Sequence, residues 1–297
     1  MNLEKVLVVH KRTDYEVYCE QERDPRILQL VSENHFTIQD LRRAHSEHRE
    51  AMERVGAAIE ALSLSATFIR RSEIREAAYH DFGLVITLGG DGTFLETSHF
   101  VRETPMLGVN SAPSVSAGIL CAATAKTVEK LLTGIRRGSI KSVTLNRLGL
   151  SLNGSPVSEP VLNEVLIAAQ NPALTSRYVL EMGKRREDQR SSGVYIGTAA
   201  GSTAVMRAAG SKVLPLQSRQ IQYLVREPYR GPGRTSKLVR GTISPRVPLR
   251  LHSKMRGGMI FIDGTHVRYR FDYGDSVEVV PQALALTVYG LASKRRV

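Results

Sequence analysis

The sequence predicts an α/β fold in two domains, an N-terminal α/β domain over residues 1–122 and a C-terminal β-rich domain over residues 123–281. Three observations predict it: a strand, helix, strand order in the first half, a glycine-rich turn after a buried strand, and short alternating apolar segments in the second half. At 297 residues and 42% hydrophobic content, the chain is long enough for two domains. We expect the tail, residues 282–297, to pack back on the first domain.

The first half has the pattern of a parallel sheet with crossover helices. Short β-branched apolar runs predict its strands, and apolar residues at helical spacing predict its helices. The expected strands are Val6–His10, Thr67–Ile69, Leu84–Leu88 and Pro105–Val109, and the expected helices are Ile38–Leu62 and Val128–Arg136. Ligands of such sheets bind at the carboxyl ends of the strands. We therefore expect a site directly after Leu84–Leu88.

The second half has the pattern of antiparallel β-structure. Gly, Pro and Asn separate its apolar segments, as they do where strands are joined by turns. The expected strands are Ser142–Asn153, Val161–Ala169, Ser176–Met182, Gly193–Thr198, Val247–His252, Met259–Ile262 and Ser276–Val280, and the expected helix is Ser202–Gly210.

Composition narrows the class of partner. The formal net charge of +12 indicates an acidic partner. The chain has no Trp and no zinc-finger spacing, and few aromatic residues lie among its basic segments, so we expect small polyphosphates and no nucleic acid. Its apolar runs fall short of the about 20 residues of a membrane span, so we expect no membrane partner. Cys19 and Cys121 lie far apart without metal spacing, which favours a reduced cytoplasm and no structural zinc.

Residues 84–96 read LVITLGGDGTFLE and predict a phosphate-binding turn. Gly89, Gly90 and Gly92 leave room for a phosphate to reach the backbone, and Thr93 is placed to cap the helix that follows. Asp91 stands out, because a carboxylate among phosphates repels them unless it takes a proton, binds a hydroxyl or holds a metal ion. A bare G-G-D-G segment is equally typical of an ordinary tight turn. In such a turn the aspartate accepts hydrogen bonds from nearby backbone amides.

Three further patterns follow in the second half. Asn163–Glu164 interrupts an apolar strand, and buried amide and carboxylate groups need partners, either a β-bulge or a ligand's hydroxyls. Gly197–Ala204, GTAAGSTA, is a second small-residue loop before an expected helix, typical of close ligand approach or of a plain turn. Asp263–Gly264 alone predicts a structural hairpin turn.

The chain resembles the NAD kinase family in the order of its motifs. These are G-G-D-G-T, the N-S…S-A-G-I-L segment at 110–120, L-N-E, T-x-x-G-S-T-A and D-G. The resemblance covers residues 84–264. It implies a Rossmann-like α/β domain, a β-sandwich domain, and transfer of the γ-phosphoryl of ATP, or in some members of polyphosphate, to the 2′-hydroxyl of the adenosine ribose of NAD or NADH. It also implies a divalent cation, Mg²⁺ in most members, and a homo-oligomer, a dimer or tetramer.

The resemblance assigns roles by position. Asp91 would be the general base, and the phosphate and ATP-binding residues would be Gly89, Gly90, Gly92 and Thr93. The NAD(H)-binding residues would be Asp91, Gly92, Asn163, Glu164, Thr198, Ala200, Ser202 and Thr203, with Gly201 lining the same pocket. Phosphoryl transfer requires mainly positioning and charge neutralisation, which the residues of the turn can supply.

The chain departs from the common bacterial pattern in ways that resemble the plant NADH kinase branch. Ser192–Gly193 stands where bacterial members have D-G, and TAAGSTAV replaces T-P-T-G-S-T-A-Y. The missing carboxylate predicts that NADH is accepted at least as well as NAD⁺, with the positive field of the segment Arg185–Arg190 acting in the same direction. The opposing hypothesis is that Glu187 or Asp188 replaces that carboxylate. The preference between the two dinucleotides stays open at this point.

Two other functions share part of the pattern. A lipid kinase can carry the G-G-D-G-T turn, but it lacks L-N-E and T-x-x-G-S-T-A in this order. A dinucleotide-binding regulator without catalysis would not need Asp91.

Overall fold

The computed structural model describes residues 3–74, 76–231, 236–244, 246–281 and 284–292. The chain divides into two compact units, Met1–Val143 with Leu286–Ala292, and a second unit that begins at Thr144 and runs to Ala285. Residues 123–143, which the sequence analysis assigned to the second domain, lie in the first unit because helix α4 (Val128–Arg136) packs on helix α2 (Gln39–Ala61). In the described part of the chain, no helix is both long enough and apolar enough to span a bilayer.

The first unit is built on a seven-stranded sheet of order β2-β1-β3-β4-β19-β6, with β5 beside β4. Its strands are β1 (Lys5–His10), β2 (Ser65–Arg70), β3 (Leu84–Gly89), β4 (Met106–Asn110), β5 (Ala123–Thr124), β6 (Ser142–Leu145) and β19 (Leu286–Tyr289). The strands β2, β1, β3 and β4 pair in parallel. The four strands and the parallel arrangement expected from the sequence are confirmed.

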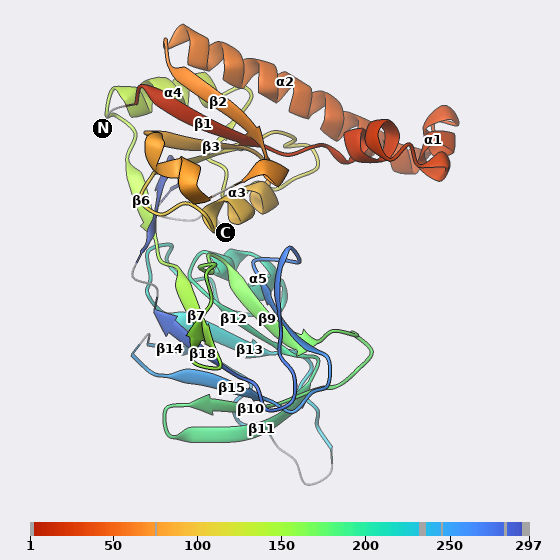
Figure 1. The fold of residues 1–297 in the computed structure, drawn as a ribbon, viewed down its shortest axis with the longest axis vertical. Coiled ribbons are helices and arrows are strands. Elements are labelled where there is room, and N and C mark those ends of the chain that lie inside the picture. The colour runs from red at the N-terminus through yellow and green to blue at the C-terminus, as the bar shows by residue number, and fades with distance from the viewer. Residues whose placement is uncertain (1–2, 75, 232–235, 245, 282–283, 293–297) are drawn as a thin grey trace. The chain divides into compact units, whose positions relative to one another are not determined.

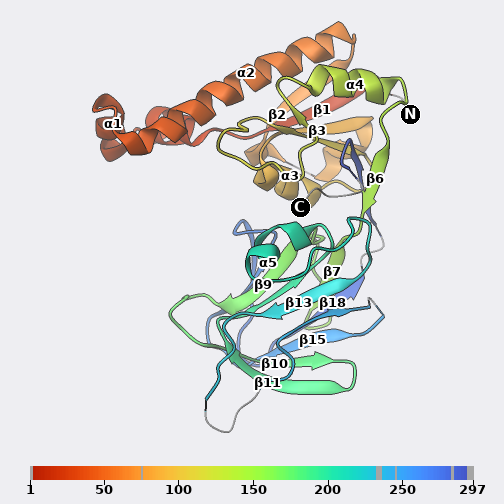
Figure 2. The same ribbon diagram turned by 180° about the vertical axis from the view of Figure 1, so that it is seen from behind.

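Helices cover both faces of this sheet. α2 and α4 lie on one face and α3 (Asp91–Ser98) lies on the other (Figures 1 and 2). Apolar residues of α2 and α4, such as Val55 and Leu132, form one buried cluster with the strands. α1 (Pro25–Ser32) and a short π-helix, Glu16–Gln21, fill the connection after β1, and 3₁₀ turns occupy Phe36–Ile38, Arg71–Glu73 and Glu76–Asp81.

The C-terminal segment returns to this sheet. β19 pairs in parallel with β4, with Val288 opposite Met106, and both residues are fully buried. A strand from the end of the chain therefore completes the hydrophobic core of the first unit.

The second unit consists of two six-stranded antiparallel sheets. Their orders are β11-β10-β15-β18-β7-β8 and β14-β13-β12-β9-β16-β17. The strands are β7 (Leu148–Leu152), β8 (Ser155–Pro156), β9 (Glu164–Ala169), β10 (Ser176–Met182), β11 (Arg185–Ser191), β12 (Val194–Gly197), β13 (Ile221–Val225), β14 (Arg240–Ile243), β15 (Leu249–Ser253), β16 (Gly258–Ile262), β17 (Val267–Arg270) and β18 (Ser276–Pro281). Residues of both sheets, among them Tyr178, Leu251, Ile167 and Ile196, share one buried cluster, so the unit is a sandwich.

Several elements of the second unit differ from the expectation. The expected strand Ser142–Asn153 divides at Asn146–Arg147, and its first part, β6, joins the sheet of the first unit. The expected helix Ser202–Gly210 is a 3₁₀ turn, Gly201–Thr203, followed by the short α5, Val205–Ala208. β11 was not among the expected strands, yet every second side chain at its end, Gln189 and Ser191, is buried against the sandwich.

Candidate functional site

The predicted phosphate turn joins β3 to α3. Glycine occupies its three glycine positions for different structural reasons. A Cβ on Gly89 would lie 2.2 Å from the Thr93 hydroxyl, and one on Gly90 would lie 2.6 Å from the Ser116 hydroxyl. Both glycines therefore permit close packing within the chain. A Cβ on Gly92 would have no neighbour within 4 Å, so Gly92 is the glycine that leaves open space at the turn.

Thr93 does not cap the helix as expected. Gly90 is the N-cap residue and makes no side-chain capping bond, and Thr93 lies inside the first turn, almost fully buried. The first helical hydrogen bonds run from the N–H groups of Thr93 and Phe94 to the carbonyl of Gly90. The N–H groups of Asp91 and Gly92 precede these bonds, at the positive end of the helix dipole.

The Asp91 carboxylate is held by the backbone of a second loop. Its Oδ1 accepts the N–H of Leu120 at 2.7 Å, and its Oδ2 accepts the N–H of Ile119 at 3.0 Å. An ionised carboxylate can accept about four hydrogen bonds, so both oxygens keep capacity for a further partner. The loop thereby fixes the orientation of Asp91 and leaves lone pairs on both oxygens for a ligand.

Asn110 organises this second loop. Its side-chain amide donates to the carbonyl of Ser116 at 2.9 Å, and its oxygen accepts the N–H of Ala112 at 3.2 Å. Gly118 adopts a positive φ of 57°, and a Cβ there would lie 2.3 Å from the Asn110 amide nitrogen. The N-S…S-A-G-I-L segment is therefore the support of Asp91.

In the second unit, Asn163 and Glu164 form a turn that Asp263 holds from another hairpin. The Asp263 carboxylate accepts the backbone N–H groups of Leu162, Asn163 and Glu164 at 2.7, 2.7 and 3.0 Å. The N–H of Asp263 in turn donates to the carbonyl of Glu164 at 2.9 Å. Asp263, interpreted from the sequence as an ordinary turn residue, is thus the anchor of the L-N-E motif.

The GTAAGSTA segment also holds the turn that carries Asn163 and Glu164. Thr198 donates its hydroxyl to the carbonyl of Leu162, and its N–H donates to the carbonyl of Asn163 at 2.9 Å. A Cβ on Gly201 would lie 2.2 Å from the Asn163 carbonyl oxygen, so this position requires glycine. The three patterns of the second half therefore meet in one assembly.

The remaining residues of that segment lie next to this assembly. Ser202 is fully buried, and its hydroxyl donates to the carbonyl of Ala199 and accepts the N–H of Leu214. Ala200 is buried, and Thr203 is half-buried with its hydroxyl 3.4 Å from the Ala200 carbonyl. In this structure the hydroxyls of Thr198 and Ser202 act within the chain, and the assigned contacts of Thr198, Ala200, Ser202 and Thr203 with NAD(H) stay predictions.

Two polar atoms of this turn are buried without a hydrogen-bond partner in the described residues, Oδ1 of Asn163 and Oε2 of Glu164. Such atoms are costly unless a ligand or water satisfies them. Burial, and secondarily the charge of Asp263, raises the pKa of Glu164 to about 8. At neutral pH the carboxyl group is therefore mostly protonated and can donate a hydrogen bond.

We expect Glu164→Gln to stabilise the chain increasingly as pH rises from about 5 to about 8. The unfolded carboxyl ionises near its ordinary pKa of 4.5, whereas the folded one keeps its proton until about pH 8. The folded state binds the extra proton in this window, so the free energy of unfolding of the wild type falls as pH rises. Urea unfolding at pH 5, 6.5 and 8 measures the difference, and a difference that stays constant with pH contradicts it.

Ser192 lies in a turn tied to Arg226. The N–H of Ser192 donates to the Arg226 carbonyl at 3.0 Å, and the Arg226 guanidinium lies 3.4 Å from the Ser192 carbonyl and over the ring of Tyr195. Arg185 is seven residues away along extended β11, about 20 Å. Screening removes most of an interaction over that distance. Of the expected field only Arg190 lies near Ser192 along the chain, and Arg226, which also lies 3.9 Å from the Glu227 carboxylate, adds a positive charge there.

The two acids proposed as replacements for the missing carboxylate have other partners. Asp188 forms an ion pair with Lys254 at 2.9 Å. Glu187 accepts the backbone N–H groups of Lys237 and Leu238. Each carboxylate thus already has a partner within the chain in this conformation.

Comparisons with known proteins identify the family. The family model described as ATP-NAD kinase N-terminal domain matches residues 5–140. A probable NADH kinase of Oryza sativa is 32% identical over 81% of this chain and 81% of its own length, and the NADH kinase of Arabidopsis thaliana is 34% identical over 70% and 73%. The chain belongs to the NAD kinase family. The expected resemblance, including its plant branch, is confirmed.

Solved NAD kinase structures share the fold. Yeast NADH kinase complexed with NADH superposes with a TM-score of 0.72 over 99% of this chain and 85% of its own, at 15% identity. An NAD kinase from Archaeoglobus fulgidus in complex with ATP gives 0.67 over 96% and 92%, at 18% identity. The expected fold class, an α/β domain followed by a β-rich domain, is confirmed.

Two functional features of this NAD kinase family member were missed from the sequence. Asp263 was not recognised as an anchor because its partners lie about 100 residues earlier in the sequence. The pairing of β9 with β16 brings them together. Arg226 was not assigned a role from the sequence. A signal for Asp263 was present, because a D-G turn directly after an apolar strand places a carboxylate at that strand's end.

Proposed function

We propose that this chain is a kinase that transfers the γ-phosphoryl of ATP to the 2′-hydroxyl of the adenosine ribose of NAD or NADH, forming NADP(H). The observation that carries the proposal is the Asp91 carboxylate, which the N–H groups of Ile119 and Leu120 orient at the glycine-rich turn. The relatives named as NADH kinases support the same activity.

In the proposed reaction Asp91 accepts the proton of the 2′-hydroxyl. The resulting oxygen nucleophile forms a bond to the γ-phosphorus, the bond from that phosphorus to the β,γ-bridging oxygen breaks, and ADP leaves. The N–H groups of Asp91 and Gly92 at the start of α3 stabilise phosphate charge. Asn163 and Glu164 bind the dinucleotide through the two atoms that lack partners in the described chain.

A divalent cation, Mg²⁺, belongs to the same proposal. The described residues hold no group of three or more His, Cys, Asp or Glu placed to bind a metal ion. Mg²⁺ in phosphoryl-transfer sites is held largely by the substrate's phosphates, so a cation delivered with the donor does not require such a group. When bound, the cation neutralises phosphate charge.

A coupled assay tests the proposed function. Purified protein is incubated with ATP, Mg²⁺ and NAD⁺ or NADH, and NADP(H) is measured with an NADP-specific dehydrogenase. Formation of NADP(H) supports the kinase. Phosphorylation of diacylglycerol or sphingosine without NADP(H) formation would indicate a lipid kinase, and tight NAD binding without turnover would indicate a regulator. Replacing ATP with polyphosphate determines the donor.

We also propose that the protein is cytoplasmic and forms a dimer or tetramer. The free thiols Cys19 and Cys121 fit a reducing compartment. The oligomeric state follows from the family resemblance, and light scattering after size-exclusion chromatography measures it.

For dinucleotide preference, we expect NADH to be used at least as well as NAD⁺, and Ser192→Asp to raise the NAD⁺ to NADH ratio of kcat/KM by about tenfold. The oxidised nicotinamide ring is a cation, which a carboxylate attracts and Arg226 repels. Because the new carboxylate can pair with Arg226, the substitution is also measured together with Arg226→Gln. A strong NAD⁺ preference of the wild type, or an unchanged ratio in both variants, would refute this electrostatic explanation and leave the kinase assignment intact.

A further inference from the structure

A pocket of about 300 Å³ lies at the carboxyl ends of β1 and β2. His10 and Arg70, the last residues of these strands, are paired in register and line it, together with side chains of the segment 11–21. The N–H of Lys11 donates to the carbonyl of Leu88, in the strand that enters the glycine-rich turn. The pocket and the turn therefore share one sheet edge. The strand order reverses between β1 and β3, so the turn after β3 lies where such sheets bind ligands, and the pocket lies on the β2 side of β1.

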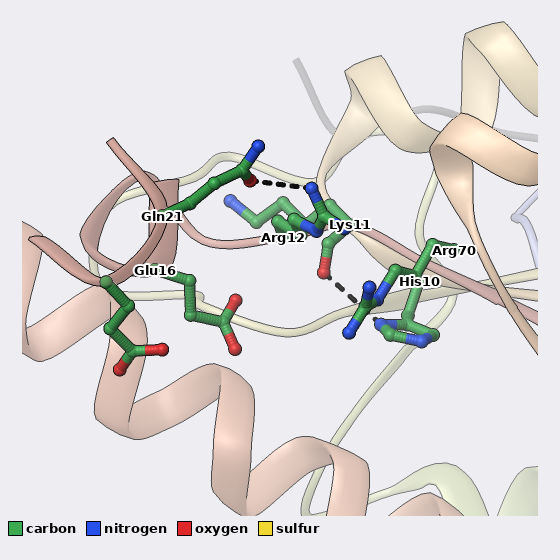
Figure 3. Close-up of a pocket in the computed structure, with 7 residues that line it drawn as sticks. His10, Lys11, Arg12, Glu16, Gln21 and Arg70 are labelled. Carbon is green, nitrogen blue, oxygen red and sulfur yellow. Dashed lines mark hydrogen bonds between the residues drawn. The ribbon is translucent and has the colours of Figure 1, made fainter. Parts of the chain in front are cut away.

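The pocket is lined by three cationic side chains, Lys11, Arg12 and Arg70, and by two carboxylates, Glu16 and Glu20. Lys11, Arg12 and Arg70 gather at the end of β1, with Glu16 apart from them in the view of Figure 3. The Glu16 carboxylate accepts the N–H of Thr13 at 2.7 Å and its hydroxyl at 3.2 Å. Although burial acts to raise it, these bonds lower the pKa of Glu16. Glu16 thus has its own partner, and with Glu20 counted the lining still carries one positive charge more than negative.

The three cationic side chains differ in the partners that they already have within the chain. Arg12 donates to the side-chain oxygen of Gln21 at 2.6 Å. Among the residues that the structure describes, no carboxylate forms a hydrogen bond or ion pair with the Lys11 ammonium or the Arg70 guanidinium. His48, behind Lys11, adds no charge at neutral pH, because burial and then the Lys11 charge lower its pKa to about 4.

An ammonium and a guanidinium without acidic partners favour phosphate, which arginine binds in bidentate fashion and lysine as a point charge. Small-molecule sites occupy about 300–1,000 Å³, so this pocket accommodates part of a nucleotide rather than a whole dinucleotide. A triphosphate also carries more negative charge than the diphosphate bridge of NAD(H).

We propose that this pocket binds the phosphate groups of the phosphoryl donor, with Lys11 and Arg70 as the phosphate-binding residues. The inference rests on the proposed kinase function and extends the donor site from the glycine-rich turn to β1 and β2. Loss of one charge-assisted contact weakens binding by about tenfold or more.

The test uses the full chain with Lys11→Gln and Arg70→Gln, each of which removes charge and keeps most of the side chain. The matched control is Arg54→Gln, an exposed arginine on α2 outside the pocket. Calorimetry with inorganic tripolyphosphate and with ATP gives direct affinities, and steady-state kinetics give KM for ATP and for NADH. We expect both pocket variants to raise the Kd for tripolyphosphate and the KM for ATP by about tenfold, with KM for NADH and the control unchanged.

Two results would overturn the proposal. One is an unchanged KM for ATP in both folded variants, and the other is a rise in KM for NADH with KM for ATP unchanged, which would assign the pocket to the acceptor. Failure of the proposed function is distinct, because it appears as wild-type protein that forms no NADP(H), while the tripolyphosphate measurement still reports on the pocket.

Discussion

Asp91→Asn should lower kcat by about 10²–10⁴-fold while the protein stays folded. The amide cannot accept the ribose proton, and the rate enhancement due to the base is lost. One carboxylate oxygen becomes an NH₂ group that faces the N–H of Ile119 or Leu120, so part of the loop's support is lost as well. The measurement is kcat at saturating ATP and NADH, with circular dichroism and urea unfolding on the same preparation.

Asp24→Asn is the control for the same change of carboxylate to amide away from the candidate site. Asp24 caps α1, and its Oδ1 accepts two backbone N–H groups, those of Arg26 and Ile27. We expect this control to keep kcat within about twofold and to change stability little, since asparagine caps a helix about as well as aspartate and its amide oxygen can accept both N–H groups. Near-normal kcat in folded Asp91→Asn would remove Asp91 from the role of base.

Asp263→Ala should destabilise the chain by at least about 3 kcal/mol and abolish measurable dinucleotide binding. Hydrogen bonds to a charged group contribute about 1.5–3 kcal/mol each, and this carboxylate accepts three backbone N–H groups. Without them the turn that carries Asn163 and Glu164 loses its fixed geometry. Asp263→Asn should be intermediate, because one oxygen can still accept the N–H groups of Asn163 and Glu164.

Urea unfolding and calorimetry with NAD⁺ and ATP measure the two effects. The control is Asp272→Ala, which removes a carboxylate that accepts the N–H of Gly257 in the same unit. We expect the control to cost about 1–3 kcal/mol and to leave NAD⁺ affinity unchanged. Unchanged NAD⁺ affinity in folded Asp263→Asn and Asp263→Ala would show that the anchor does not position the binding turn.

The elements predicted best are those whose sequence pattern is local and long. Helix α4 begins and ends at the expected residues, and α2 differs by one residue at each end, because their apolar spacing is regular and the faces are buried. β11 was missed because its charged residues conceal the alternation that ends in Gln189 and Ser191. Its strand state depends on pairing with β10, which no local pattern encodes.

The turn after β3 illustrates the same limit at the candidate site. The spacing of Gly89, Gly90 and Gly92 predicted a turn, but not that two of these glycines make room for Thr93 and Ser116. Thr93 was expected to be the cap because threonine favours that position, yet the helix begins earlier and buries its side chain. At this position tertiary packing overrides the preference of threonine for the helix cap.

By itself the sequence determined the α/β order of the first half, the β-structure of the second, and the motifs that place the chain among NAD kinases, since periodicity and motif spacing are properties of neighbouring residues. Tertiary structure decided which groups meet: Asp91 with the amides of Ile119 and Leu120, Asp263 with the turn at Asn163, and His10 with Arg70. These partners are 28 to 100 residues apart. Strand order and register, set by burial of whole faces, bring them together.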